Sequence, residues 1–160
     1  MRVEVSSEVP WEKRKVRRLE RFMGRLMRKM GLGSGWELSV ALVEEERIRD
    51  LNRTYRGRDE PTDVLAFPQM AEDELAAARN VKPAYPEPLG DIVICLPVAK
   101  EQAEETGVTE EEEISMLAVH GLLHLVGFDD ETDEGAERMR AMEKGLLGRN
   151  TYSKSEKERL

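Results

Sequence analysis

The chain has 160 residues, of which 39% are hydrophobic and 36% are charged, and its formal net charge is −8. This length predicts a single domain with a substantial hydrophobic core. No apolar run approaches the ~20 residues of a membrane-spanning helix, the first residues lack the apolar core of a signal peptide, and the single Cys95 excludes an internal disulfide. We therefore expect a cytoplasmic protein without membrane contact, and we interpret Cys95 as core filling rather than as a metal ligand.

Strands and helices alternate in the predicted first half. Residues 2–6 alternate as a short strand, and apolar residues then recur at helical spacing over 16–30, in a helix that Pro10 can open. The glycine-rich residues 31–35 end this helix. The pattern then predicts a strand over 37–43, a helix over 44–55, a loop over 57–61 and a strand over 64–67.

The second half contains the strongest core signals. Residues 71–88 have no sustained period and predict a mobile loop, with at most a helical turn near 75–78. The nearly all-apolar segment 91–96 is typical of a central strand, and Pro97 opens a helix that runs to about residue 106. Thr109 and Glu112 form a capping box for the core helix, and a last helix spans about 133–147. We expect residues 151–160 to be a flexible tail.

Basic residues are concentrated near the start of the chain. The segment 12–29 has two acidic residues, whereas its basic residues are Lys13, Arg14, Lys15, Arg17, Arg18, Arg21, Arg25, Arg28 and Lys29. Such a helix face is typical of a surface that binds a polyanion, with Arg17, Arg21 and Arg28 as candidates for contact with an RNA backbone. An ordinary solvated helix face has the same pattern, so both interpretations stay open.

His120 and His124 are the only histidines of the chain and lie four residues apart in the predicted core helix. This spacing puts both imidazoles on one helix face, where they can bind one ion. Gly127 can end the helix with a positive φ, which would bring Asp129 or Asp130 to the same ion and leave one tetrahedral position for water. The alternative is two core histidines that bond to backbone carbonyls, but the glycine and the acids downstream favour a metal site.

Two further positions bear on the chemistry. Peptidases with the motif His-Glu-x-x-His use the glutamate as general base, and this chain has Gly121 at that position, which argues against a metallopeptidase. Arg56 precedes Gly57 at the predicted end of a helix, where a guanidinium can grip a phosphate with two hydrogen bonds. The alternative is that Arg56 pairs with a local carboxylate such as Asp59 or Asp63.

These clusters resemble the YbeY family of bacterial rRNA maturation factors, which are taken to be metal-dependent endoribonucleases specific for single strands. The resemblance rests, in chain order, on Asn52, Tyr55, Arg56, Gly57, residues 61–65, Phe67, residues 89–92, His120, Gly121, residues 123–125 and residues 127–129. It implies an α+β fold in which a mixed four-stranded sheet packs against about five helices, in one domain over residues 1–150.

The resemblance also implies function. It implies one Zn²⁺ ion in a cleft, with Mn²⁺ or another divalent ion as the alternative, and a role in 3′-end maturation of small-subunit (16S) rRNA and in ribosome quality control. The implied partners are the rRNA precursor, the small ribosomal subunit, a ribosomal protein and an Era-type GTPase. The family pattern assigns metal ligands to His120 and His124 and the catalytic, phosphate-binding arginine to Arg56.

The chain departs from the family at the third metal ligand, where Asp130 replaces the usual histidine. A carboxylate in this position can still bind zinc, and Asp129, Glu131 and Asp133 are its rivals. The added negative charge should make bound water less acidic and let Mn²⁺ compete better, so we expect an alkaline-shifted pH optimum relative to three-histidine relatives. The missing histidine and the missing base also support a second hypothesis, a non-catalytic ribosome-assembly factor with a structural metal.

Overall fold

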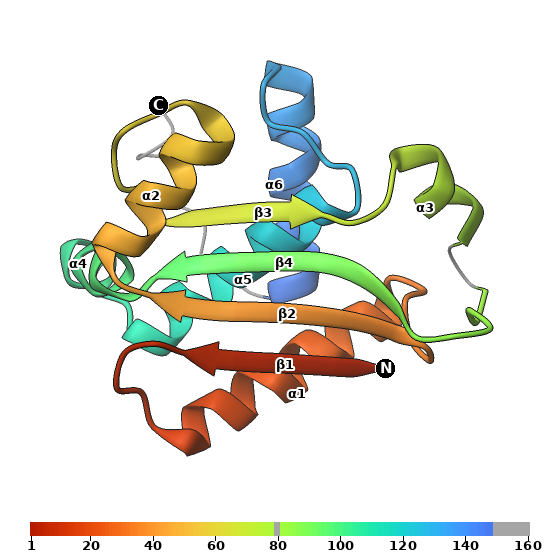
Figure 1. Cartoon of the computed structure of the whole chain (residues 1–160), viewed down its shortest axis with the longest axis horizontal. Helices are drawn as coiled ribbons and strands as arrows, with labels where there is room; N and C mark the ends of the chain where they lie inside the picture. Colours follow the sequence, from red (N-terminus) through yellow and green to blue (C-terminus); the bar gives the residue numbers. More distant parts are fainter. Residues whose placement is uncertain (79–80, 149–160) are drawn as a thin grey trace.

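The fold is built on one four-stranded sheet. The structure is a computed structural model that describes residues 1–78 and 81–148. The strand order is β1-β2-β4-β3, with bounds β1 (Arg2–Ser7), β2 (Trp36–Val43), β4 (Glu87–Cys95) and β3 (Val64–Pro68). The first three are parallel, whereas β3 at the edge runs antiparallel to β4 (Figure 1). The mixed sheet confirms the predicted α+β class, and the apolar strand β4 is central as expected.

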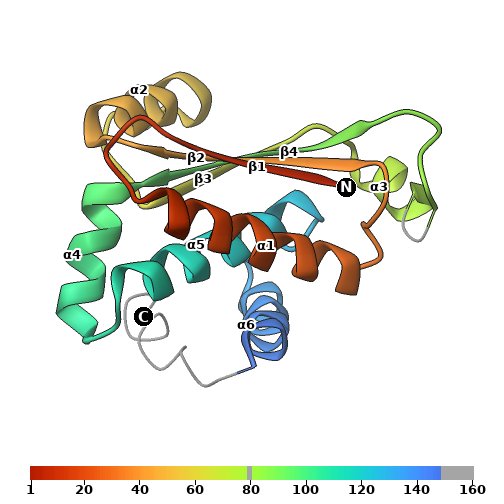
Figure 2. The ribbon, with the colours of Figure 1, turned by 90° about the horizontal axis from the view of Figure 1, so that it is seen from below.

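Helices cover both faces of the sheet unequally. On one face, α1 (Lys13–Lys29) packs on β1 and α5 (Glu110–Leu125) packs on β3 and β4, while α6 (Asp133–Leu147) packs on α5 (Figure 2). On the other face lies α2 (Glu45–Arg56). At one end of the sheet α4 (Leu96–Thr106) packs against α5, and α3 (Glu72–Ala78) lies at the opposite end. No helix of the described ranges is long and apolar enough to span a membrane.

Side chains alternate between the two faces of the sheet along each strand, so the core consists of two clusters, one on each face. Leu38, Val40 and Leu42 of β2 face the larger core beneath α1 and α5. Val43, on the opposite face of the strand, joins a smaller cluster beneath α2 that contains Ile48 and Cys95. Cys95 is fully buried, as its interpretation as core filling requires, and burial raises the pKa of its thiol.

Three predicted boundaries were wrong. The helix expected from Pro10 begins at Lys13, because the chain stays extended at Glu12 while the Trp11 indole donates a hydrogen bond to Glu110 at 2.7 Å. The strand expected from Asp91 begins at Glu87, because its first residues pair with the start of β2. The pairing of the two strands shifts register between Glu37 and Leu38. At its other end this strand stops at Cys95, since Leu96 is the first residue of α4.

The segment 71–88 is more regular than the predicted loop. It contains α3 and the first residues of β4, so the described residues form six helices rather than about five. Three acidic residues in the first turn of α3 favour its positive dipole end, and Leu75, 3% exposed, anchors it to the core. One anchoring residue in seven positions produces no detectable period.

The turns on either side of α5 follow the sequence closely. The Thr109 hydroxyl accepts a hydrogen bond from the Glu112 backbone amide at 3.1 Å, which confirms the predicted N-cap. At the other end Gly127 has φ +97° and reverses the chain, as expected. The predicted tail at 151–160, and residues 149–150 of the predicted domain, lie outside the described residues, so the domain bounds stay a prediction.

Candidate active site

Two imidazoles and one carboxylate converge beside the C-terminal end of α5. The Nε2 atoms of His120 and His124 are 3.1 Å apart. After the reversal at Gly127, Asp130 places one carboxylate oxygen 3.7 Å from His120 Nε2 and the other 3.8 Å from His124 Nε2. One donor atom from each residue lies within 4.8 Å of the other two. Ligand atoms around a tetrahedral zinc ion are about 3.3 Å apart. The two imidazole nitrogens are close to this spacing and the carboxylate oxygens lie slightly beyond it, so the donor set fits a metal ion.

Two of the rival acids, Asp129 and Glu131, line the same cleft as Asp130, but among the described residues Asp130 alone groups with the two histidines at metal-ligand spacing. Asp129 Oδ1 accepts a hydrogen bond from the Glu131 backbone amide at 2.9 Å and so stabilises the turn before α6. Asp133 begins α6 itself, where it favours the positive end of the helix dipole. Within the described ranges, His120, His124 and Asp130 are the one group of three side chains spaced to hold an ion. Asp130 therefore remains the predicted third ligand.

Glu143 of α6 supports this group and was not among the residues predicted from the sequence. Its carboxylate is 0% exposed, and its Oε1 lies 2.9 Å from His120 Nδ1. An ionised carboxylate can only accept a hydrogen bond, so Nδ1 donates and the Nε2 lone pair is left to face Asp130 and His124. Carboxylate–imidazole pairs of this kind orient histidines that bind metals.

The surroundings of His124 favour its neutral form. Burial and the neighbouring His120 lower its pKa, and the opposing effects of Asp130, the Phe128 backbone and Asp129 do not outweigh them. A neutral imidazole offers a lone pair to an ion near pH 7 without first losing a proton. The bonding of His120 to Glu143 also differs from the alternative of two core histidines that bond to backbone carbonyls.

Packing explains why a glycine follows His120. A Cβ on Gly121 would lie 2.7 Å from Ile92 Cγ2, on the adjacent strand β4. Because α5 approaches the sheet this closely, the helix has no room at position 121 for the glutamate that serves peptidases as general base. The absence of that base is therefore a consequence of how the histidine helix packs.

Arg56 is the last residue of α2 and lines the same cleft as the two histidines. Gly57 ends α2 in the left-handed conformation with φ +69°, and the buried Asn52 side chain donates a hydrogen bond to the Glu60 carbonyl at 2.8 Å, which holds the following loop. Arg56 forms no ion pair with any residue of the described ranges. Its suggested partner Asp59 instead bonds Arg49 at 2.9 Å, an interaction that lowers the pKa of the Asp59 carboxyl.

The cleft has a volume of about 630 Å³ and gathers residues from distant parts of the sequence. One wall is the edge strand β3, and another is the C-terminal half of α5. Tyr55 stands at its mouth, 66% exposed, with its ring centroid 5.2 Å from that of Phe67. The two sequence clusters, 64 residues apart from Arg56 to His120, thus meet at one site.

The predicted RNA-contact residues lie elsewhere. Arg17, Arg21 and Arg28 are exposed on α1, and none of them lines the cleft. Arg21 lines a separate groove between α1 and α5. The structure therefore brings Arg56 to the candidate metal ligands and leaves the basic face of α1 apart from them.

Known proteins match most of this chain. The family model described as Endoribonuclease YbeY matches residues 4–151. The Endoribonuclease YbeY of Bacillus cytotoxicus is 45% identical over 120 residues, which are 74% of this chain and 75% of the relative. That of Bacillus cereus is 41% identical over 131 residues, which are 81% of this chain and 82% of the relative.

A solved structure is also similar. The solution structure of TM1509 from Thermotoga maritima matches with a TM-score of 0.58 and 30% sequence identity, over 91% of this chain and 89% of that one. The family model spans both clusters that form the cleft, the loop after α2 and the histidine helix with its turn. The chain therefore belongs to the YbeY endoribonuclease family.

Proposed function

We propose that this chain is a metal-dependent endoribonuclease that cleaves single-stranded rRNA precursors, with Zn²⁺ held by His120, His124 and Asp130. The observation that carries the proposal is that an arginine without an ion-pair partner among the described residues lines one cleft together with the three candidate ligands. The relatives' name, Endoribonuclease YbeY, supports the same reaction.

Different residues of the cleft have different roles in the proposed reaction. When bound, a divalent ion supplies Lewis acidity that lowers the pKa of a water ligand and polarises the scissile phosphate. Arg56 binds two phosphoryl oxygens with its guanidinium and stabilises the negative charge that develops on them. Glu143 fixes the tautomer and orientation of His120. Since Gly121 supplies no base, the attacking water would lose its proton either in the field of a bound ion alone or to a group from elsewhere in the protein.

RNA has two further surfaces available on this chain. The exposed Tyr55 ring at the mouth of the cleft can stack on an unpaired base, which favours single strands over duplexes. The basic face of α1, with Arg17, Arg21 and Arg28, can hold the backbone of a longer substrate. Charge reversal of these three arginines should weaken RNA binding and flatten its salt dependence.

The cellular role is proposed from family membership. We place the activity in the cytoplasm, in 3′-end maturation of 16S rRNA and in ribosome quality control. The proposed partners are the rRNA precursor, the small ribosomal subunit, a ribosomal protein and an Era-type GTPase. Mn²⁺ or another divalent ion is the alternative to Zn²⁺, because a carboxylate in the third position favours harder ions than a histidine does.

Cleavage and metal content together test this function. We expect purified protein to contain one metal ion per chain and to cleave a single-stranded rRNA fragment, and His124→Ala to lose both the ion and the activity. Arg56→Ala should keep the ion and lose about 10²–10³-fold in kcat, because one charge-stabilising donor is removed. Arg58→Ala removes the same charge two residues away, outside the cleft, and should retain activity.

The alternative of a structural metal makes the opposite prediction. In that case His124→Ala would lower the stability of the fold, while any RNA cleavage by the preparation would survive both this change and chelation. Such cleavage would identify a contaminating nuclease and refute the proposed activity.

A further inference from the structure

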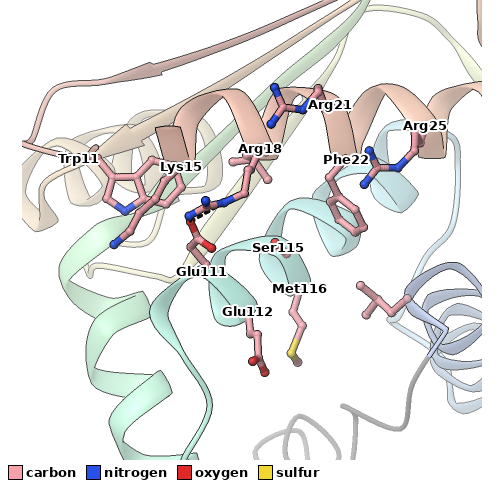
Figure 3. A pocket seen from close by; sticks show the side chains of 12 residues that line it. Trp11, Lys15, Arg18, Arg21, Phe22, Arg25, Glu111, Glu112, Ser115 and Met116 are labelled. Atoms are coloured by element: carbon pink, nitrogen blue, oxygen red, sulfur yellow. Dashed lines mark hydrogen bonds and ion pairs between the residues drawn. The ribbon is translucent and has the colours of Figure 1, made fainter. Parts of the chain in front are cut away.

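A second hollow lies between α1 and α5, apart from the metal cleft. It has a volume of about 400 Å³, and its basic side chains, Lys15, Arg18, Arg21 and Arg25, all come from α1. The aromatic Trp11 and Phe22 lie on the same side, and Ser115 and Met116 of α5 lie opposite (Figure 3). We call this hollow the α1–α5 groove.

One end of the groove is closed by contacts within the protein. Arg18 forms an ion pair and hydrogen bonds with Glu111, and the Trp11 indole bonds to Glu110. Lys15 lies 4.0 Å from Glu12. The acidic first turn of α5 thus neutralises this end of the groove and leaves less charge there for a ligand.

The other end keeps its positive charge. Arg21 and Arg25 are exposed, lie one turn apart on α1, and form no ion pair with any residue of the described ranges. Phe22 is half-buried between them, and Figure 3 shows Phe22 and Arg25 pointing from α1 toward the space beside α5. The nearby Glu112 points away from α1 (Figure 3). This end therefore combines an aromatic surface with two uncompensated guanidinium groups.

We propose that the α1–α5 groove is a second binding site for single-stranded RNA, with a base against Phe22 and backbone phosphates on Arg21 and Arg25. The proposal rests on the proposed function, which supplies RNA as the substrate. Aromatic rings that alternate with cations are how proteins hold single strands without reading their sequence. Of the three arginines proposed for α1 as a whole, Arg21 is the one that lines the groove.

The side chains of the groove favour a nucleotide over a protein helix, because a docking helix lays an apolar face into an apolar groove. Four of the twelve residues that line this groove are cationic, and Arg21 and Arg25 among them form no ion pair with a described residue. The groove and the cleft lie at different levels along α5, because their residues on this helix are about 12 Å apart along its axis. A strand of several nucleotides beyond the scissile bond can therefore occupy both sites, whereas a very short strand occupies the cleft alone.

RNA affinity as a function of length and salt tests the proposal. The probes are fluorescein-labelled oligouridylates of 20 and 4 nucleotides, and binding is followed by anisotropy in the Arg56→Ala background, where cleavage is slow. The test variant adds Arg21→Ala with Arg25→Ala. The matched control adds Lys82→Ala with Lys100→Ala, which removes the same charge from exposed positions outside the groove.

The double arginine variant should bind the 20-mer about tenfold more weakly at low salt. The slope of log K against log salt should become shallower by about 1.4, since each phosphate contact on a single strand contributes about 0.7. Affinity for the 4-mer should not change. Phe22→Leu should weaken 20-mer binding about fivefold without changing the slope, because it removes stacking and no charge. With Arg56 intact, the same arginine changes should raise KM for the 20-mer and leave kcat unaltered.

Three results would overturn the proposal. One is an unchanged affinity and slope in the double arginine variant, and another is an equal loss in the lysine control. The third is displacement of the 20-mer by a deca-glutamate peptide at equal charge concentration, which would identify an acidic protein segment as the occupant. The proposed function fails by a different observation, namely that the wild-type protein cleaves no RNA. That result does not depend on what the groove binds.

Discussion

Gly121 offers a direct test of how the histidine helix is positioned on the sheet. A Cβ at this position would meet three atoms of Ile92, Cγ2 at 2.7 Å, Cγ1 at 3.1 Å and Cδ1 at 3.2 Å. Ile92 is 0% exposed and packs within the larger core cluster, so it cannot turn out into solvent. Gly121→Ala therefore overpacks the core, which costs about 1–3 kcal/mol. The gain in helix propensity offsets about 1 kcal/mol of this cost.

Gly145 of α6 is the matched control. It lies in the last turn of α6, and a Cβ there would meet no atom of the described residues within 4 Å. Gly145→Ala should gain helix propensity alone, at most about 1 kcal/mol. The two variants should thus differ by about 1–3 kcal/mol in the free energy of unfolding, or roughly 2–12 °C in Tm for a chain of this size.

Thermal and urea unfolding of both variants measure this difference. Adding Ile92→Ala to Gly121→Ala removes all three crowding atoms, so the double variant should be more stable than the sum of the single changes predicts. Metal affinity should fall in Gly121→Ala, because His120 shifts with the helix. Equal stability of the two alanine variants would refute the packing argument. It would also reopen position 121 to a glutamate base.

Three further outcomes follow from the site and the core. Asp130→His should move the pH–rate profile to lower pH, since removing the carboxylate charge makes bound water more acidic; an unchanged profile would contradict this. Glu143→Gln should weaken zinc binding about 10–100-fold in titration calorimetry without unfolding the protein, and wild-type affinity would exclude a role for Glu143 in orienting His120. Cys95 should react with iodoacetamide only as fast as the core opens, because it is fully buried with a raised thiol pKa; labelling as fast as in urea would contradict the packing of β4.

The candidate metal ligands could be predicted because their geometry is local. Spacing of four residues on a helix fixes two imidazoles relative to each other, and a glycine with positive φ fixes where the chain turns next. Glu143 could not be assigned in this way, because its contact with His120 depends on how α6 packs on α5. A signal was present, since Glu143 shares the inward helical phase of Met139 and Leu146.

Whether Arg56 pairs with a local carboxylate could not be decided from the sequence, for a related reason. Asp59 follows Arg49, Arg53 and Arg56 closely, and spacing alone permits a contact with each of them. In the fold, the loop runs back along α2 because Asn52 holds the Glu60 carbonyl, so Asp59 reaches Arg49. Likewise, the start of β4 at Glu87 depends on pairing with β2, which lies more than 40 residues earlier in the chain.

Helix α5 links these features because three of its faces point to different parts of the molecule: the sheet, the cleft and the α1–α5 groove. At about 100° per residue, Gly121 turns toward the sheet, the two histidines toward the cleft, and Ser115 toward the α1–α5 groove. A shift of α5 at Gly121 would therefore displace the candidate metal ligands and change the width of the groove together. Because α5 also carries Glu111, which pairs with Arg18, the position of α1 depends on the same helix. The close contact between Gly121 and Ile92 thus affects both the position of the candidate metal ligands and the width of the α1–α5 groove.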